Sequence, residues 1–153
     1  FGVTPQAADY VRSTRHGVDD IVRFIHENKH RLDSMDMIVC NEELQQKIWK
    51  RAAGATDEIY ITSSIHNLVE VADRQAGKRT GLAFFTELLG LKREETAAFG
   101  DADNDIDMIR YAGYGIAMAN ASEACKQAAD FVTGHHDEDG VAEGLKNILK
   151  LIK

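Results

Sequence analysis

The sequence has little cysteine and no long apolar run. Its two cysteines, Cys40 and Cys125, lie far apart, without a Cys-x-x-Cys spacing or the density of a disulfide scaffold. We therefore expect reduced thiols and a cytoplasmic protein. No stretch approaches the roughly 20 consecutive apolar residues that a membrane-spanning helix needs, so we expect no membrane partner.

Positive charge is also scarce. With 18 Lys and Arg against 25 Asp and Glu, the formal charge is −7, which offers no global basic surface for nucleic acid. A single proline argues against a disordered chain, and 153 residues with 44% hydrophobic content suit one globular domain. The start at Phe1 lacks Met and does not resemble a signal peptide. A processed product, a chosen boundary and a fragment all stay open.

In the first half of the chain, apolar periodicity predicts helices and strands in turn. Two carboxylates, Glu42 and Glu43, suit the start of a helix that Gly54 would end. The expected helices are Val18–Lys29 and Glu42–Ala53, and the expected strands are Met35–Cys40, Glu58–Thr62 and Asn67–Val71.

In the second half, short apolar strands alternate with helices, which is typical of a parallel α/β sheet. The expected strands are Thr96–Phe99, Gly115–Met118 and Asp130–Thr133, and the expected helices are Arg79–Leu89, Asp105–Ala112, Ser122–Ala129 and Asp139–Leu151. The change of pattern between Asp73 and Gly77 predicts a boundary there.

The stretch from Phe99 to Met108 carries the strongest chemical signal. Five polar or acidic residues follow a buried strand where a helix begins, namely Asp101, Asp103, Asn104, Asp105 and Asp107. Ligands of open α/β sheets lie beyond the carboxyl ends of the strands, and clustered carboxylates there favour a hard cation such as Mg²⁺. Helix capping by Asp103 or Asn104 is the alternative, but it explains only one of these side chains.

Several blocks in this order resemble the haloacid dehalogenase superfamily, in particular the tail of its Cof-type phosphatases. They are Gly100-Asp101-x-x-Asn104-Asp105-x-x-Met108, Ala112-Gly113-x-Gly115-Ile116-Ala117-Met118-x-Asn120-Ala121, Ala129-Asp130-x-Val132-Thr133 and Glu138-Asp139-Gly140-Val141-Ala142. The resemblance is strong from Lys78 to about Leu149, and weaker over Glu58–Ala72. It implies an α/β fold in which residues 74–153 form the C-terminal half of a Rossmann-like parallel-sheet core. Residues 1–73 would be part of an α+β cap domain that governs substrate specificity.

The resemblance also implies roles for four residues. Asp101 would be a Mg²⁺ ligand, and Asn104 would hydrogen-bond the bound phosphate or its surroundings. Asp105 would orient neighbouring groups at the catalytic site. Lys78 would offset charge on the nucleophile and on the transferring phosphoryl group, a role that suits a compact ammonium.

The nucleophile that the resemblance implies is not found. In these phosphatases an Asp-x-Asp-Gly-Thr-type motif supplies the attacking carboxylate, and a second Asp two residues on assists hydrolysis of the aspartyl-phosphate. Asp137-Glu138-Asp139-Gly140 follows polar residues instead of a buried strand, and Asp101-Ala102-Asp103 belongs to the last-loop pattern. We therefore interpret the chain as a fragment of a Mg²⁺-dependent phosphatase of small phosphorylated metabolites such as sugar phosphates, inactive alone.

Two other functions stay open. The chain could be a non-catalytic binding or assembly module that pairs with a missing N-terminal half or with itself, or the fold could serve a sugar phosphomutase. Of the remaining residues, we expect His26, His30, His135 and His136 to be solvent-exposed and Trp49 and Tyr60 to pack within the cap. Exposed residues near Ser63 to Asn67 are candidates for substrate contact.

Overall fold

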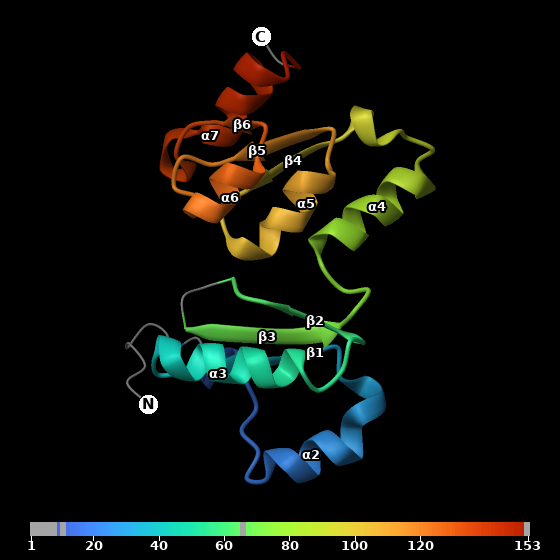
Figure 1. The fold of residues 1–153 in the computed structure, drawn as a ribbon, viewed down its shortest axis with the longest axis vertical. Helices are drawn as coiled ribbons and strands as arrows, with labels where there is room; N and C mark the ends of the chain where they lie inside the picture. The colour runs from blue at the N-terminus through green and yellow to red at the C-terminus, as the bar shows by residue number, and fades with distance from the viewer. Residues whose placement is uncertain (1–8, 10–11, 65–66, 152–153) are drawn as a thin grey trace.

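The structure is a computed structural model that describes residues 9, 12–64 and 67–151, and in them the chain forms two three-stranded sheets. The sheets lie one after the other along the long axis of the molecule (Figure 1). The first has the strand order β1-β3-β2 and the second β4-β5-β6. In the described part of the chain, no helix is long and apolar enough to cross a bilayer.

The first sheet is antiparallel throughout. Its strands are β1 (Ser34–Ile38), β2 (Ile59–Thr62) and β3 (Leu68–Asp73), and they lie where the alternating pattern predicted strands. The central strand β3 pairs with both neighbours, with Val69 opposite Met37 and Val71 opposite Ile61. Val69 is fully buried and is the best-packed residue of this sheet.

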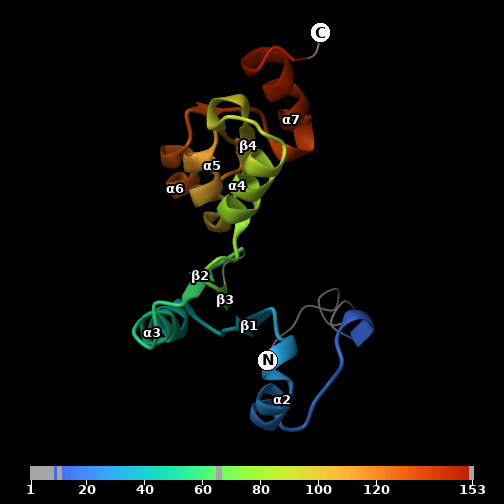
Figure 2. The same ribbon diagram turned by 90° about the vertical axis from the view of Figure 1, so that its right-hand side faces the viewer.

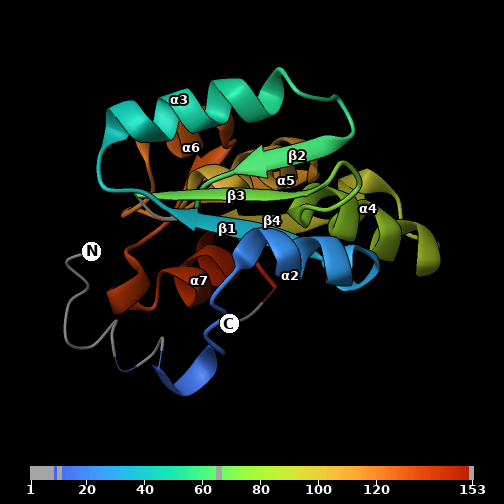
Figure 3. The same cartoon turned by 90° about the horizontal axis from the view of Figure 1, so that it is seen from below.

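Helix α3 (Glu42–Ala53) has the predicted bounds because its ends carry clear signals. Asn41 Oδ1 accepts a hydrogen bond from Leu44 N at 2.8 Å and caps the first turn, and Gly54 follows the last residue. The side-chain amide of Gln45 donates to the Leu68 carbonyl at 2.9 Å, which joins α3 to β3. Figures 1 and 3 show α3 running along this sheet.

Helix α2 (Ile21–Asn28) lies at the β1 side of the first sheet (Figures 2 and 3). Asp20 caps it by accepting a hydrogen bond from Arg23 N at 2.9 Å. The helix has the predicted amphipathic pattern, but Ile21 and Val22 on its apolar face are exposed. Burial of Ile21 and Val22 therefore does not explain why this helix forms, whereas the Asp20 cap stabilises its first turn.

The second sheet is parallel, as the sequence predicts. Its strands are β4 (Ala97–Gly100), β5 (Tyr114–Ala117) and β6 (Phe131–Val132), with β5 in the centre. Helices α5 (Ile106–Tyr111) and α6 (Glu123–Ala128) connect them. The core of this part is one buried cluster, made of Ile109, Ala117, Ala121 and Cys125.

The last helix differs from its prediction. In place of one helix over Asp139–Leu151, the chain forms α7 (Gly140–Glu143), which continues as a π-helical turn over Gly144–Ile148. Asp139 and Lys150 both adopt left-handed backbone angles, each with a φ of 54°. A left-handed residue cannot continue a right-handed helix, so these two positions set limits that side-chain periodicity does not reveal.

One segment, residues 74–77, joins the two sheets within the described chain, and helix α4 (Lys78–Leu88) follows it (Figure 1). Gly77 precedes the helix with a φ of 122°, a conformation that other residues rarely adopt. The Tyr60 ring lies so close that a Cβ at position 77 would meet it at 3.2 Å. The connection therefore packs against the first sheet at Tyr60. It fixes the position of Lys78, the first residue of α4.

Candidate active site

The polar residues at the carboxyl ends of the parallel strands lie on three consecutive loops. Asp101 follows β4, Asn120 lies beyond β5, and His135 and His136 follow β6. Because parallel strands end at one edge of a sheet, these loops meet there. The edge faces the first sheet in Figure 1.

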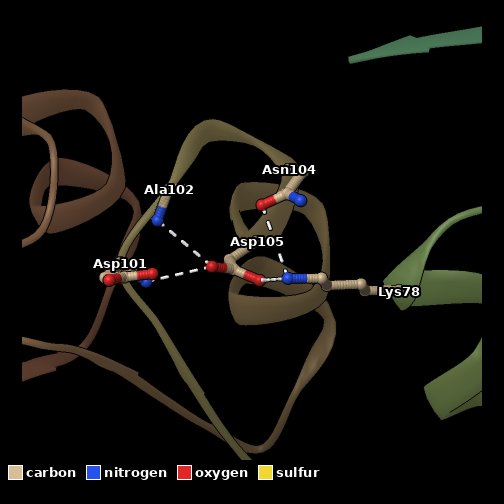
Figure 4. A network of polar contacts seen from close by, with 5 residues as sticks. All are labelled: Lys78, Asp101, Ala102, Asn104 and Asp105. Atoms are coloured by element: carbon tan, nitrogen blue, oxygen red, sulfur yellow. Dashed lines mark hydrogen bonds and ion pairs between the residues drawn. The ribbon is translucent and has the colours of Figure 1, made fainter. Parts of the chain in front are cut away.

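The Asp105 carboxylate is the buried centre of the β4 loop. The residue is 3% exposed, and its Oδ2 accepts hydrogen bonds from Asp101 N at 3.0 Å and Ala102 N at 3.1 Å. Its Oδ1 pairs with Lys78 Nζ (Figure 4). A carboxylate removed from water needs such partners on both oxygens, so this side chain fixes the loop and the lysine together.

Gly100 is required by the same side chain. The Asp105 side chain lies directly over the Gly100 backbone, where any Cβ would overlap with Asp105 Cβ and Cγ. The glycine therefore allows the carboxylate to fold back against the end of β4. This contact gives a physical reason for the Gly100-Asp101 pair in the motif.

Lys78 reaches the loop from the first residue of α4. Its Nζ lies 3.4 Å from Asn104 Oδ1 as well as against Asp105, so three of the four candidate residues make direct contact (Figure 4). The Lys78 side chain is 47% exposed. The Lys78 ammonium is therefore bound by protein groups, while about half of the side chain stays open to solvent.

Asp101 is the fourth candidate residue, and it joins this group through its backbone. Its carboxylate belongs to a different interaction, in which Asp101 Oδ2 accepts a hydrogen bond from Asn120 Nδ2 at 2.9 Å. Asn120 Oδ1 in turn accepts from His136 N at 3.1 Å. Asn120 therefore connects all three strand-end loops. The position of Asn120 directly after β5 was a sequence signal for a role at this edge, but the resemblance assigned no role to Asn120.

The capping alternative for this loop is wrong for both residues considered. Neither Asp103 nor Asn104 accepts a capping hydrogen bond at the start of the 3-10 turn Asp103–Asp105 or of α5. Asp103 Oδ1 accepts from Ser122 Oγ at 2.8 Å, which adds a second link between the β4 and β5 loops. Ser122, which also caps α6, was not predicted as part of the site.

The donor set at this edge fits a hard divalent cation. Asp101 is exposed, and carboxylate and amide oxygens of Asp101, Asp103 and Asn120 lie on adjacent loops. Oxygen ligands of this type suit Mg²⁺, which usually keeps several waters and takes few protein ligands. Asp101 would hold the ion, with its carboxylate oriented by Asn120.

The histidine loop has a different chemistry. Ligand atoms of His135, His136 and Asp137 lie within 4.8 Å of one another, whereas the sequence analysis interpreted the two histidines as part of a solvent-exposed loop. His136 Nδ1 is 2.9 Å from Asp137 Oδ1, and His135 Nδ1 accepts from Asp137 N at 3.2 Å. These contacts lie within one turn and build its shape. His136 and Asp137 are exposed, but His135 is half-buried, which differs from its expected exposure. His26 and His30 are exposed, as expected.

Cys125 lies buried beneath the acidic loop. Burial first, and then the nearby carboxylates of Asp105, Asp101 and Asp103, raise the pKa of this thiol above its usual range. A neutral thiol is a poor nucleophile. Cys125 therefore belongs to the core and contributes no nucleophile to the site.

A cleft of about 620 Å³ lies beside Asp101, between the two parts of the molecule. One wall comes from the strand-end loops of the second sheet, and the other comes from α3 and the end of β2. Ser63 and Ser64 line it, in agreement with the expected contact region, whereas Ile65 and His66 lie outside the described residues. Trp49, which we expected to pack within the cap, is half-buried and also lines the cleft.

Comparison with known proteins identifies the family. The profile of the haloacid dehalogenase-like hydrolases matches residues 4–145. The chain belongs to this family. It is 44% identical over 101 residues to the phosphatase YwpJ of Bacillus subtilis, a match that covers 66% of this chain and 35% of that protein. It is 47% identical over 76 residues to a phosphoglycolate phosphatase of Archaeoglobus fulgidus, covering 50% of this chain and 34% of that one.

Solved structures of the family show the same fold. A haloacid dehalogenase-like hydrolase from B. subtilis superposes with a TM-score of 0.80 at 30% identity, over 94% of this chain and 51% of that chain. A subclass IIB sugar phosphatase superposes with a TM-score of 0.72 at 30% identity, over 83% of this chain and 47% of that chain. The chain thus matches about a third of the curated relatives' length and about half of the solved structures.

Proposed function

We propose that this chain is the C-terminal part of a Mg²⁺-dependent phosphatase that hydrolyses small phosphorylated metabolites such as sugar phosphates. Residues 74–153 would be half of the catalytic core, and residues 1–73 part of a cap domain. The observation that carries the proposal is the Lys78–Asp105 pair beside Asp101 at the ends of parallel strands. Membership of a hydrolase family with phosphatase relatives supports it.

In this proposal, each residue at the loop has a separate task. Lys78 places a positive charge beside the phosphoryl group, and Asp105 holds the ammonium in place. Asn104, within 3.4 Å of that ammonium, would donate its amide to a phosphate oxygen. Asp101 would hold Mg²⁺, which when bound neutralises phosphate charge and orients the phosphoryl group.

The nucleophile in this proposal comes from outside the 153 residues. Its carboxylate oxygen would form a bond to phosphorus while the bond to the alcohol oxygen breaks and that oxygen gains a proton. Water would then attack the aspartyl-phosphate, releasing phosphate and restoring the carboxylate. Asp139, in the one Asp-x-Asp-Gly sequence of the chain, has a left-handed φ after a 3-10 turn and does not follow a strand.

A binding module is the second candidate, and one observation favours it. Strand β4 pairs only with β5 among the described residues, and helix α4, which precedes β4 in the chain, exposes Phe84, Phe85 and Leu88, followed by the exposed Leu89. An open strand edge beside an apolar surface favours association. In the phosphatase proposal, the N-terminal half of the protein would cover this same surface. The exposed surface is therefore compatible with either function.

Hydrolysis of para-nitrophenyl phosphate tests the proposal. We expect no turnover above background by the chain alone, and Mg²⁺-dependent turnover by the longer parent protein. In the parent, Asp101→Ala should remove at least about 99% of the activity, since one metal contact is worth several kcal/mol in the transition state. Asp107→Ala, which removes an exposed carboxylate of α5, is the matched control and should retain activity.

Two results would contradict the proposal. One is turnover by the pure chain that Asp101→Ala abolishes, because the nucleophile would then lie within these residues. The other is full activity of the parent after that substitution. Phosphate release, measured together with transfer between sugars, separates a phosphatase from a phosphomutase.

The cellular location in this proposal is the cytoplasm. Both cysteines are free thiols, Cys40 exposed and Cys125 buried. Persistent free thiols are typical of a reducing compartment.

A further inference from the structure

The cleft beside Asp101 has two chemically different walls. The wall of the second sheet carries Asp101 and Asp103 at the proposed phosphate site. The opposite wall is built by four residues of α3 and two that follow β2, namely Glu42, Gln45, Gln46, Trp49, Ser63 and Ser64. A substrate whose phosphate lies at Asp101 would extend the rest of its structure toward this second wall.

The charged side chains that line the cleft in the described residues are all negative. Among the described residues that line it, three are carboxylates, Glu42, Asp101 and Asp103, and none is Lys or Arg. Mg²⁺ at Asp101 would balance a phosphate at one wall. At the other wall, a second anion of the substrate would lie near Glu42 without a partner, which costs free energy.

We propose that Glu42 and Trp49 make this enzyme select phosphate esters of neutral, polyhydroxylated molecules and exclude substrates that carry a second anionic group. This inference rests on the proposed phosphatase function. It assigns the selectivity to two residues, and it separates the chain from relatives named for phosphoglycolate, whose substrate carries a carboxylate.

The contacts of α3 support the roles proposed for Trp49 and Glu42. Trp49 is half-buried and offers an apolar ring face against which the carbon–hydrogen face of a sugar can pack. The Glu42 carboxylate accepts from the Gln46 amide at 3.3 Å and has acceptor capacity for hydroxyl groups. Gln45 Nε2 donates to the Leu68 carbonyl, so this amide group positions α3 against β3.

The start of α3 does not offset this negative wall. Helix N-termini attract anions, but the first turn of α3 already carries Glu42 and Glu43, and Asn41 accepts from Leu44 N. The two carboxylates also provide a matched pair for experiment. Both are exposed and belong to the same turn, yet only Glu42 lines the cleft.

Trp49 is the only tryptophan of the chain, so its fluorescence reports on the cleft directly. The probes are glucose 6-phosphate and 3-phosphoglycerate, each titrated with Mg²⁺ present. We expect glucose 6-phosphate to bind about ten-fold more tightly, the effect of one like-charge contact at a partly exposed site. Glu42→Gln should reduce this preference to about two-fold or less, whereas Glu43→Gln should leave it unchanged.

Three results would overturn the selectivity proposal. They are equal affinity for the two probes, a preference that survives Glu42→Gln, and no change in Trp49 emission with the sugar phosphate. Calorimetry with inorganic phosphate and Mg²⁺ tests the proposed function separately. In the longer parent protein, phosphate binding that is lost in Asp101→Asn supports that function even if the selectivity proposal fails, and the absence of any Mg²⁺-dependent phosphate binding contradicts it.

Discussion

Asp105 shows how one buried side chain can organise a site. Its two oxygens bind different parts of the chain, the backbone after β4 and the ammonium of Lys78 at the start of α4. The family resemblance predicted that Lys78, Asp101, Asn104 and Asp105 belong to one site, because three of them lie in one motif and Lys78 opens the helix before it. It did not predict Asn120 or Ser122 as partners, since their hydrogen bonds reach residues 19 positions away.

We predict that Lys78→Met destabilises the chain by about 1–3 kcal/mol, because it leaves a buried carboxylate without its cationic partner. Urea unfolding followed by circular dichroism measures this change. Lys47→Met, an exposed lysine of α3, is the control and should change the unfolding free energy by less than about 0.5 kcal/mol. Equal stabilities of the two variants would show that the ion pair contributes nothing.

The two cysteines should differ in reactivity. Burial and the neighbouring carboxylates raise the pKa of Cys125, so its thiolate fraction at neutral pH is small, and it rises only as the pH approaches the raised pKa. We expect iodoacetamide to label Cys40 rapidly and Cys125 only slowly. In Cys40→Ser, fast labelling should be lost in the folded chain and return in urea. Fast labelling of the folded Cys40→Ser chain would contradict this prediction.

At the scale of elements, the sequence predicted the features that local signals determine and missed those that long-range contacts determine. Helix α3 has its predicted bounds because Asn41 and Gly54 mark its ends. The parallel pairing of β4, β5 and β6 also follows from short apolar strands separated by helices. The last helix could not be predicted, because the left-handed Asp139 and the π-helical turn after α7 depend on how the chain packs.

The apolar surface of α4 should cause the isolated chain to self-associate. Phe84 is 60% exposed and Leu88 is 65% exposed, and four-residue spacing places them on one face of the helix. We predict that the double substitution Phe84→Gln and Leu88→Gln lowers the average mass in light scattering at high concentration. Because these side chains are exposed, the unfolding free energy should change by no more than about 1 kcal/mol.

Glu87→Gln, on the same helix, is the control for this prediction. This substitution should leave the average mass in light scattering equal to that of the unchanged chain. If the double variant associates as strongly as the original, another surface is responsible and the role assigned to α4 is wrong.

At the scale of the whole molecule, the sequence predicted two differently built parts but not the cleft between them. Residues 42–64 and 101–122 line it from opposite sides, although they are far apart in the chain. No spacing rule links Glu42 or Trp49 to Asp101, because their proximity depends on the arrangement of the two sheets. The wall formed by α3 therefore became visible only in the folded structure.

The single passage through residues 74–77 has a consequence for how such proteins diversify. Within the described residues the chain crosses once between the two sheets, so an exchange that ends in this segment replaces the α3 wall and leaves the residues after it unchanged. The loops that carry Lys78, Asn104 and Asp105 are inherited intact in such an exchange. If the α3 wall selects the substrate as proposed, a lineage can therefore change its substrate preference while the loop from Asp101 to Asp105 stays as it was.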